Sequence, residues 1–332
     1  MTITDISGSR VVAASQARTA ATQLDRPGEP EWHNIKAPDA RTTRTVAVPK
    51  PAGRRELSLF LHNPNALFGL IFLSVMVAVA LVAPLVFPGD PLGMVGKPFL
   101  WPGQDWAYPL GTDSMGRNVL AGLFHGARIS LFVGLTATSL GLGVGLVVGS
   151  LAGYFGGWVD DVLVRIIEIF QTLPNFVLLV VLVAIAQPSA TTISVAIAIV
   201  SWPMVARLTR AEFRAIREKD YVVAARSLGF GHARIIFSEI LPNALPPLIV
   251  TASVMVATAI LMESALSFMG LGDPNLMSWG FMIGSARTVI RQAWWMSVFP
   301  GIAILLTVLA INLVGEGLND TLNPRISAKR GH

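Results

Sequence analysis

The stretch IFQTLPNFVLLVVLVAIAQPSATTISVAIAIVSWPMVA, residues 169–206, contains no Asp, Glu, Lys or Arg. A helix needs about 20 apolar residues to cross the roughly 30 Å hydrocarbon core of a bilayer, so this run is too long for a single crossing. Gln187, Pro188 and Ser189 interrupt it near its middle and favour a turn. The stretch therefore predicts two membrane-spanning helices joined by a short connection.

Similar apolar runs lie on both sides of this stretch. The predicted spans cover residues 66–87, 129–151, 162–186, 190–206, 240–262 and 292–315. The runs are continuously apolar, whereas the strands of a membrane barrel alternate between apolar and polar residues. A backbone in lipid must satisfy its own hydrogen bonds, which a helix does within one segment. We therefore expect an all-α membrane protein with six transmembrane helices.

Composition supports a membrane protein. The chain has 332 residues, of which 53% are hydrophobic and 14% charged, and its mean hydropathy is +0.60. Soluble domains carry about 25% charged residues, so the composition disfavours a cytosolic enzyme and a disordered chain. The absence of Cys excludes a disulfide framework, a thiolate metal site and a cysteine nucleophile.

The distribution of basic residues predicts the orientation. Nineteen of the 25 Lys and Arg residues lie before the first span, in the 207–239 loop or after the last span. Cytoplasmic loops carry the excess of Lys and Arg, so both termini and the 207–239 loop are predicted to be cytoplasmic. The net charge of +5 then reflects membrane topology, and we expect no nucleic-acid partner.

Three regions follow from this pattern. Residues 1–57 lack the apolar core of a signal peptide and are interpreted as a disordered cytoplasmic tail. Residues 58–320 form the six-span transmembrane domain, and residues 321–332 form a second cytoplasmic tail.

Gly141, Gly145 and Gly149 are four residues apart within the second span. They share one face of a helix and allow close approach of a neighbouring backbone, which predicts a packing seam. The partner helix belongs either to this chain or to another subunit, and a general abundance of Gly in membrane helices is the alternative.

Charged residues within or beside the spans admit two readings. Arg165 and Glu168 lie three residues apart, near each other on one helix face. Charges inside a membrane are functional candidates by default, but an ion pair near the cytoplasmic end, where the side chains snorkel to water, is the reading we favour. Glu263 and Glu316 lie at predicted span ends and are expected at the interface.

The 207–239 loop contains a candidate docking helix, YVVAARSLG, residues 221–229. Ala224, Ala225 and Leu228 are predicted to share one helical face, and Gly229 to end the helix in a left-handed conformation. A short helix with a small apolar face suits docking into a groove of a soluble partner. An amphipathic helix lying on the anionic inner leaflet is the alternative.

The outer segment, residues 264–291, is interrupted by several Gly residues and Pro274, so we expect an external loop with a short interfacial or re-entrant helix. Trp279, Trp294 and Trp295 suit the membrane interface. Motifs for chemistry are missing: the sequence has no phosphate-binding G-x-x-x-x-G-K-[ST] loop, no H-E-x-x-H, and only scattered His residues. No catalytic, cofactor-binding or metal-binding residue is predicted, and the chain is not expected to be an enzyme.

Four stretches, taken in order, carry a resemblance to a known family. They are LGTDSMGRN (110–118) followed by GARISL (126–131), GYFGGWVD (153–160), AARSLG (224–229) with ILPN (240–243), and ESALSFMGLG (263–272) with SWG (278–280). The chain resembles the permease subunits of binding-protein-dependent ABC importers. More narrowly, it resembles the C-type permease of the dipeptide, oligopeptide and nickel group, from about residue 57 to the C-terminus.

This resemblance implies a type I ABC importer permease-like bundle in the cell inner membrane. The implied partners are a second homologous permease, two ATPase domains, an extracellular substrate-binding protein and membrane lipid. ATP and Mg would bind the ATPase subunits, with no cofactor on this chain. The likeness also makes 207–239 the coupling loop, with these residues facing or shaping the ATPase contact: Tyr221, Ala224, Ala225, Leu228, Gly229, Leu241 and Pro242. Val223 stands where the family usually has Glu, and Glu239 where His is common.

Peptides are the substrate class that the resemblance favours, with nickel or another small solute as the alternative. The substrate-binding residues are not assigned by the sequence. An ion-coupled secondary transporter working alone is the competing class, for which Arg165 and Glu168 are the clear intramembrane candidates.

Overall fold

The computed structural model describes residues 60–322. The chain divides into two compact units, residues 1–51 and 52–332, and the first of these lies outside the described residues. The predicted tails over 1–57 and, beyond Leu322, over 321–332 also lie outside them. The account below concerns the helical unit.

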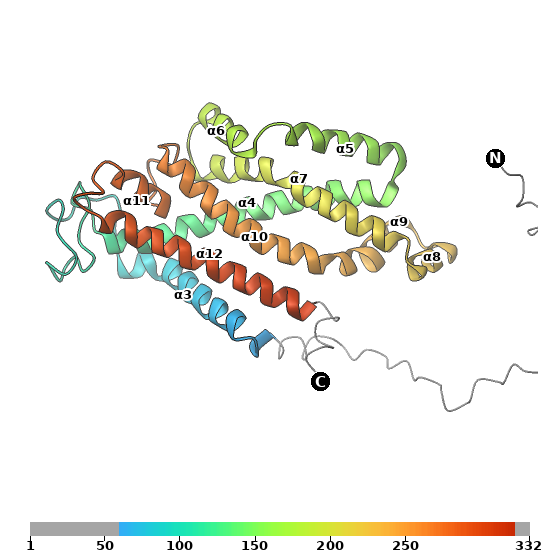
Figure 1. Ribbon diagram of the computed structural model, residues 1–332, viewed down its shortest axis with the longest axis horizontal. Coiled ribbons are helices and arrows are strands. Elements are labelled where there is room, and N and C mark those ends of the chain that lie inside the picture. Colours follow the sequence, from blue (N-terminus) through green and yellow to red (C-terminus); the bar gives the residue numbers. More distant parts are fainter. Residues whose placement is uncertain (1–59, 323–332) are drawn as a thin grey trace, which may run out of the picture. The chain divides into compact units, whose positions relative to one another are not determined.

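The described residues fold into a series of helices (Figure 1). In chain order they are α3 (Pro64–Val86), α4 (Val119–Phe155), α5 (Gly157–Gln171), α6 (Asn175–Ala186), α7 (Ala190–Arg217), α8 (Asp220–Ser227), α9 (His232–Arg234), the π-helix η3 (Ile235–Ile240), α10 (Leu241–Phe268), α11 (Trp279–Ala286) and α12 (Trp295–Leu322).

Five helices within the described residues are long and apolar enough to cross a membrane: α3, α4, α7, the continuous α9–η3–α10 segment and α12. The pair α5 and α6 supplies a sixth span if it counts as one, although its two helices meet at 80°. The expected all-α membrane architecture is therefore confirmed for this part of the chain.

The third predicted span differs from the structure in its continuity. The sequence predicted one helix over 162–186, but α5 ends at Gln171 and α6 begins at Asn175. Pro174 lies in the break and disfavours helical geometry at the residue before it, so the chain bends there. The connection predicted around Pro188 does fall between two helices, where Ser189 caps α7 by accepting a hydrogen bond from the Thr192 N–H at 3.1 Å.

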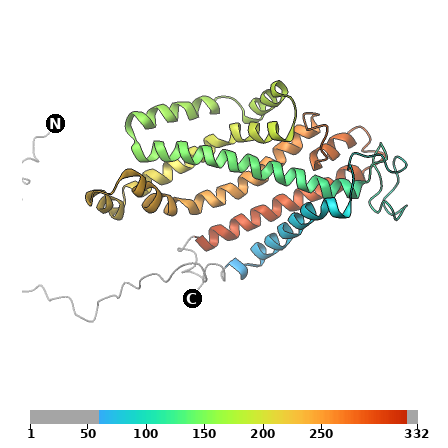
Figure 2. The same ribbon diagram turned by 180° about the vertical axis from the view of Figure 1, so that it is seen from behind.

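The predicted glycine seam packs α4 against α7 of the same chain, and the two helices lie side by side in both views (Figures 1 and 2). A Cβ added at Gly145 would lie 2.8 Å from the Trp202 carbonyl oxygen, and one added at Gly149 would lie 2.4 Å from that of Ala206. Only glycine permits this approach, since atoms of a larger residue would overlap the α7 backbone. The seam prediction is confirmed, with a partner helix inside this chain.

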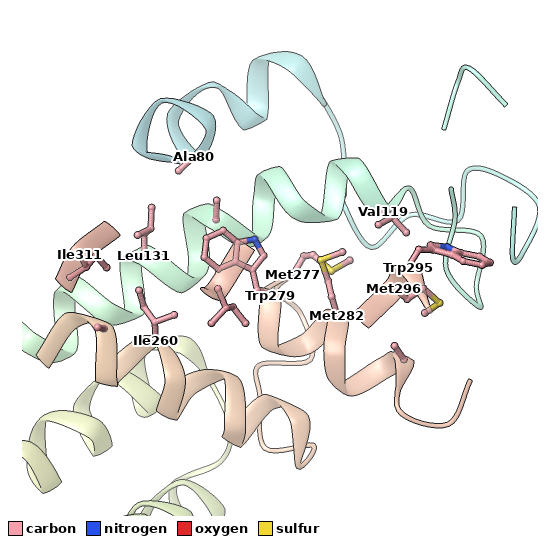
Figure 3. Close-up of a cluster of buried hydrophobic side chains, with 14 of the residues drawn as sticks. Ala80, Val119, Leu131, Ile260, Met277, Trp279, Met282, Trp295, Met296 and Ile311 are labelled. Atoms are coloured by element: carbon pink, nitrogen blue, oxygen red, sulfur yellow. The ribbon is translucent and has the colours of Figure 1, made fainter. Parts of the chain in front are cut away.

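Two of the three tryptophans expected at the interface lie in the core. Figure 3 shows Trp279 and Trp295 among the buried side chains between α4, α11 and α12, and they are 1% and 0% exposed. The Trp295 indole donates a hydrogen bond to the Thr112 carbonyl at 3.2 Å, and that of Trp279 donates to the Leu123 carbonyl at 3.0 Å. Only Trp294, which is 43% exposed, retains a surface position. The interfacial assignment was therefore wrong for Trp279 and Trp295, because each indole N–H finds a backbone acceptor inside the protein.

Glu263 also departs from its expected interfacial position. It is 2% exposed and lies between α4, α10 and α11. Its carboxyl group accepts hydrogen bonds from the hydroxyls of Ser267 at 2.8 Å, Ser278 at 2.7 Å and Ser130 at 3.4 Å. A carboxyl group is tolerated away from water when hydroxyl donors surround it, and these donors come from three different helices or their caps. Glu316, by contrast, is exposed.

Candidate coupling site

The candidate site is built around α8, which lies at the far end of the bundle from α11 (Figure 1). The α8 helix connects α7 to the α9–η3–α10 segment, so it joins two membrane-spanning helices. Its inner face is apolar: Val222 and Ala225 are 0% and 6% exposed. They belong to a buried cluster with Tyr154, Phe213, Ile216, Ile235, Ile240 and Ala244.

The outer face of α8 carries a different set of residues. Tyr221 is 40% exposed, Leu228 is 74% exposed, and Ala224 is also exposed. The sequence predicted that Ala224, Ala225 and Leu228 share one face, but the structure turns Ala225 inward beside Val222. One residue step rotates the helix by about 100°, which places the two alanines on different sides. Ala225 therefore attaches α8 to the bundle, while Ala224 lies on the free surface.

Gly229 ends α8 as the sequence predicted. Its φ of +79° is the left-handed conformation that favours glycine. The Phe230 N–H donates to the Ala225 carbonyl at 3.2 Å and the Gly229 N–H to the Arg226 carbonyl at 3.0 Å. This paired pattern is a Schellman motif, which satisfies the last carbonyls of the helix and directs the chain toward α9.

Leu241 and Pro242 lie at the start of α10 rather than on α8. Leu241 packs half-buried against the cluster beneath α8, whereas Pro242 is exposed. The wider η3 turn ends at Ile240, two residues before Pro242, whose missing N–H interrupts regular helical bonding in this region. The seven predicted residues thus fall into three groups. One group is exposed on α8, one residue is buried beneath it, and one group lies in the connection to α10: respectively Tyr221, Ala224 and Leu228; Ala225; and Gly229, Leu241 and Pro242.

Side-chain bonds hold this region to the spanning helices. The Tyr154 hydroxyl and His232 Nδ1 form a hydrogen bond at 2.8 Å, which joins the end of α4 to α9. The Arg217 guanidinium donates to the Tyr154 carbonyl at 2.9 Å and so joins α7 to the same point. These two bonds therefore hold α4, α7 and α9 together at this end of the bundle.

Electrostatics favours a neutral hydroxyl at the edge of the free surface. Burial and the nearby negative charge of Glu239 raise the pKa of the Tyr221 phenol above its ordinary value. The phenol, protonated at neutral pH as in any ordinary tyrosine, therefore also keeps its proton at higher pH and is available as a hydrogen-bond donor. Val223 is 46% exposed and adds an apolar side chain to the exposed part of α8.

Sequence reasoning missed the strongest ion pair near this end of the bundle. Asp160 on α5 is 8% exposed and accepts a hydrogen bond from Arg210 Nη2 on α7 at 2.7 Å, with a second bond from Arg210 Nε. Arg214 adds a longer contact at 3.7 Å. The paired residues are fifty positions apart, so no local spacing indicates them.

The described residues contain no group of three His, Cys, Asp or Glu side chains that could hold a metal ion. The geometry instead provides a small exposed helix between two spanning helices. The fold is shared with a chain of the MetNI methionine ABC transporter solved in inward-facing conformations, at a TM-score of 0.51 and 18% identity over 61% of this chain and 96% of that chain. This likeness defines the fold class: the helical membrane bundle found in that transporter chain.

Sequence comparison defines the family. Residues 145–328 match the binding-protein-dependent transport system inner membrane component, and residues 57–108 match the N-terminal transmembrane domain of oligopeptide transport permease C. The chain belongs to this family of inner-membrane permeases. It is a multi-pass, non-catalytic membrane subunit of a binding-protein-dependent ABC importer.

Relatives match along nearly their whole length. The di/tripeptide transport system permease protein DppC of Pseudomonas aeruginosa is 41% identical over 301 residues, covering 89% of this chain and 97% of the relative. The dipeptide transport system permease protein DppC of Escherichia coli is 39% identical over 297 residues, covering 86% of this chain and 99% of the relative. The dipeptide transport system permease protein DppC of Haemophilus influenzae is 38% identical over 273 residues, covering 80% of this chain and 92% of the relative.

Proposed function

We propose that this chain forms one half of the translocation path of an ATP-driven importer for di- or oligopeptides. The observation that carries the proposal is the full-length similarity to dipeptide permeases, 41% identity covering 97% of the Pseudomonas aeruginosa relative. A second homologous permease supplies the other half of the path. An extracellular substrate-binding protein delivers the peptide, and both termini of this chain lie in the cytoplasm.

Coupling to ATP takes place at α8. Two ATPase domains hold ATP and Mg, while this chain carries no cofactor of its own. One of these domains receives the exposed side chains of Tyr221, Ala224 and Leu228 in a groove. Gly229, Leu241 and Pro242 shape the connection, and Ala225 anchors it to the cluster beneath.

The packing beneath α8 gives this coupling a physical route. Phe213 belongs to α7 and Ala244 to α10, and both lie in the cluster that receives Val222 and Ala225. When the ATPase domains close, the displacement of α8 is passed to two spanning helices at once. An ATPase that binds the inward- and outward-open states with different affinity shifts the balance between them, whereas equal affinity would shift nothing.

Reconstitution tests the proposal directly. The chain is incorporated into proteoliposomes with its second permease, ATPases and binding protein, and uptake of radiolabelled dialanine is measured with ATP or with a non-hydrolysable analogue. We expect accumulation only with ATP and the complete complex, with competition by unlabelled dipeptides and not by nickel. Competition by nickel instead would contradict the peptide assignment. Concentrative uptake by the chain alone, driven by a proton or sodium gradient, would contradict the ABC mechanism.

A further inference from the structure

The helix α5 presents three faces of different character. One face is buried, where Asp160 binds Arg210 and Ile167 packs with Trp202 and Ala206 of α7. A second face is exposed and apolar, with Val162, Ile166 and Ile169. The third face is exposed and polar: it carries Asp161, Arg165 and Glu168, and the C-cap residue Thr172 continues it. The polar positions recur at intervals of four, three and four residues, which places them in one line along the helix.

No helix of the described unit covers the two exposed faces. In both views α5 lies at the edge of the helical unit, beside α7 and away from α3 and α12 (Figures 1 and 2). The apolar face suits lipid or a second permease. The polar face does not suit lipid, because charged groups on a lipid-facing surface are expensive. Ile167 packs against Trp202 and Ala206, which precede the basic last turn of α7. Its neighbour Glu168 therefore lies beside the apolar part of α7 and not beside its basic end.

The polar face borders a pocket that is almost entirely charged. The pocket measures about 260 Å³ and is lined by Asp161, Val164, Arg165, Glu168 and Arg210. Two carboxylates and two guanidiniums therefore balance around one cavity. Arg210 is fixed in place by Asp160, while Arg165 and Glu168 contact each other at 3.1 Å with side chains 79% and 55% exposed.

A solute that carries one positive and one negative group is complementary to this charge distribution. A solute with an ammonium group and a carboxylate group can replace the Arg165–Glu168 contact by two new charge-assisted bonds, one to each side chain. Because both side chains are largely exposed to water, the net gain from these bonds is small, and binding stays weak enough for release. Weak, reversible binding is what a transport path requires.

We infer that the pocket on α5 is a solute subsite at the α8 end of the translocation path, where Arg165 binds the carboxylate and Glu168 the ammonium group of a zwitterionic peptide. The inference rests on the proposed peptide uptake and adds residues to it. It also gives the Arg165–Glu168 pair a role beyond that of an ion pair whose ends snorkel to water.

The natural absence of Cys permits a clean accessibility test. Single cysteines are introduced as Glu168→Cys on the polar face and Ile169→Cys on the apolar face. The assembled complex, in inside-out vesicles, is treated with a membrane-impermeant thiol reagent. We expect rapid labelling at position 168, slowed by added dialanine, and slow labelling at position 169 that dialanine does not change. Equal labelling of the two positions, or labelling at 168 that dialanine leaves unchanged, would overturn the inference.

Uptake by charge variants provides the second test. Glu168→Gln and Arg165→Gln are each expected to lower dialanine uptake about tenfold, because each removes one charged hydrogen bond to the solute. Glu316→Gln removes an exposed carboxylate outside the pocket and is expected to leave uptake unchanged. The double exchange Arg165→Glu with Glu168→Arg keeps an ion pair but reverses it. A structural pair would recover uptake in this variant, whereas the subsite would remain impaired, so recovery overturns the inference.

The controls separate the possible failures. If the wild-type complex transports no dialanine, the proposed function fails and the subsite with it. If the wild type transports and the single variants match it, only the subsite fails. Assembly is checked by the basal ATPase rate of each purified complex. Uptake is also compared in vesicles with and without phosphatidylethanolamine, and a loss confined to vesicles containing this lipid would assign the pocket to its headgroup and overturn the inference.

Discussion

The Ser278 hydroxyl donates a hydrogen bond to Glu263 Oε1 at 2.7 Å, and this bond fastens α11 to α10. Ser278 is also the N-cap of α11, where its oxygen accepts from the Phe281 N–H at 3.0 Å. The other carboxyl oxygen of Glu263 reaches Ser130 on α4, whose oxygen in turn accepts from the Trp279 N–H at 3.3 Å. One buried side chain thus connects the cap of α11 to two spanning helices.

Removal of the Glu263 side chain should loosen α11. Glu263→Ala leaves three hydroxyls without their acceptor and opens a cavity, so we expect the free energy of unfolding to fall by about 2–4 kcal/mol. Glu263→Gln keeps an oxygen acceptor of the same shape and should lower it by about 1 kcal/mol or less. Thermal unfolding of the purified complex in detergent measures both, with Glu316→Gln as the exposed control. Equal losses for the two Glu263 variants would show that the hydroxyl contacts are unimportant.

The two neighbouring alanines of α8 should respond differently to a charge. Ala225→Asp places a carboxylate in the apolar cluster with Val222 and Phe213, and it should destabilise the protein by several kcal/mol. Ala224→Asp changes an exposed position, so it should leave the melting temperature unchanged and lower ATP-dependent uptake by at least about tenfold, through loss of a partner contact. Melting temperature and uptake are measured for both. Normal uptake by a stable Ala224→Asp complex would exclude this face as the ATPase contact.

The left-handed C-cap of α8 can be tested with a closely matched pair of glycines. Gly229 has a φ of +79° and Gly231 a φ of −65°, and an added Cβ meets no atom within 4 Å at either position. Gly229→Ala should therefore lower stability by about 1–2 kcal/mol through backbone strain alone. Gly231→Ala should change it little or raise it slightly. Chemical denaturation of the detergent-solubilised complex compares the two, and identical midpoints would contradict the assignment of strain to Gly229.

The seam between α4 and α7 offers a second matched pair. A Cβ at Gly145 would lie 2.5 Å from the Val205 Cβ, whereas one at Gly143 meets no atom within 4 Å. Gly145→Ala must push the helices apart and should lower stability by about 1–3 kcal/mol. Gly143→Ala should be neutral or mildly stabilising because alanine is the better helix former. Yield and melting temperature of the membrane-extracted complex distinguish the two variants. If both behave like the wild type, the seam is not closely packed.

Local patterns were sufficient for several features. The run over 169–206 predicted a connection around Pro188, and the structure places one there, between α6 and α7, although the span predicted before it is divided into α5 and α6. The spacing of Gly145 and Gly149 predicted a close helix contact, and the position of Gly229 predicted the end of α8. Each of these depends on neighbours within about four residues along the chain, where helical geometry converts sequence spacing into spatial position.

Other features depend on which distant residues meet. The spacing of Ala224 and Ala225 could not say which of them faces Phe213, and the bend at Pro174 was hidden within one apolar run. The Asp160–Arg210 pair links residues fifty positions apart, so the spacing of neighbouring residues does not predict it. A carboxyl group at the end of a predicted span was a signal for the Glu263 cluster, but its serine donors could be identified only after α11 was placed.

By itself, the sequence determined that this protein lies in a membrane as a helical bundle, because the hydropathy of a continuous segment decides its solvent and lipid forces its backbone into helices. The tertiary structure decided which polar groups on those helices are buried and which are exposed. Glu263 and Arg165 both lie in apolar surroundings in the sequence, yet one is enclosed by hydroxyl donors and the other lines an open charged pocket. Lipid imposes helical geometry on every span alike, whereas the environment of a single side chain depends on the helices packed around it.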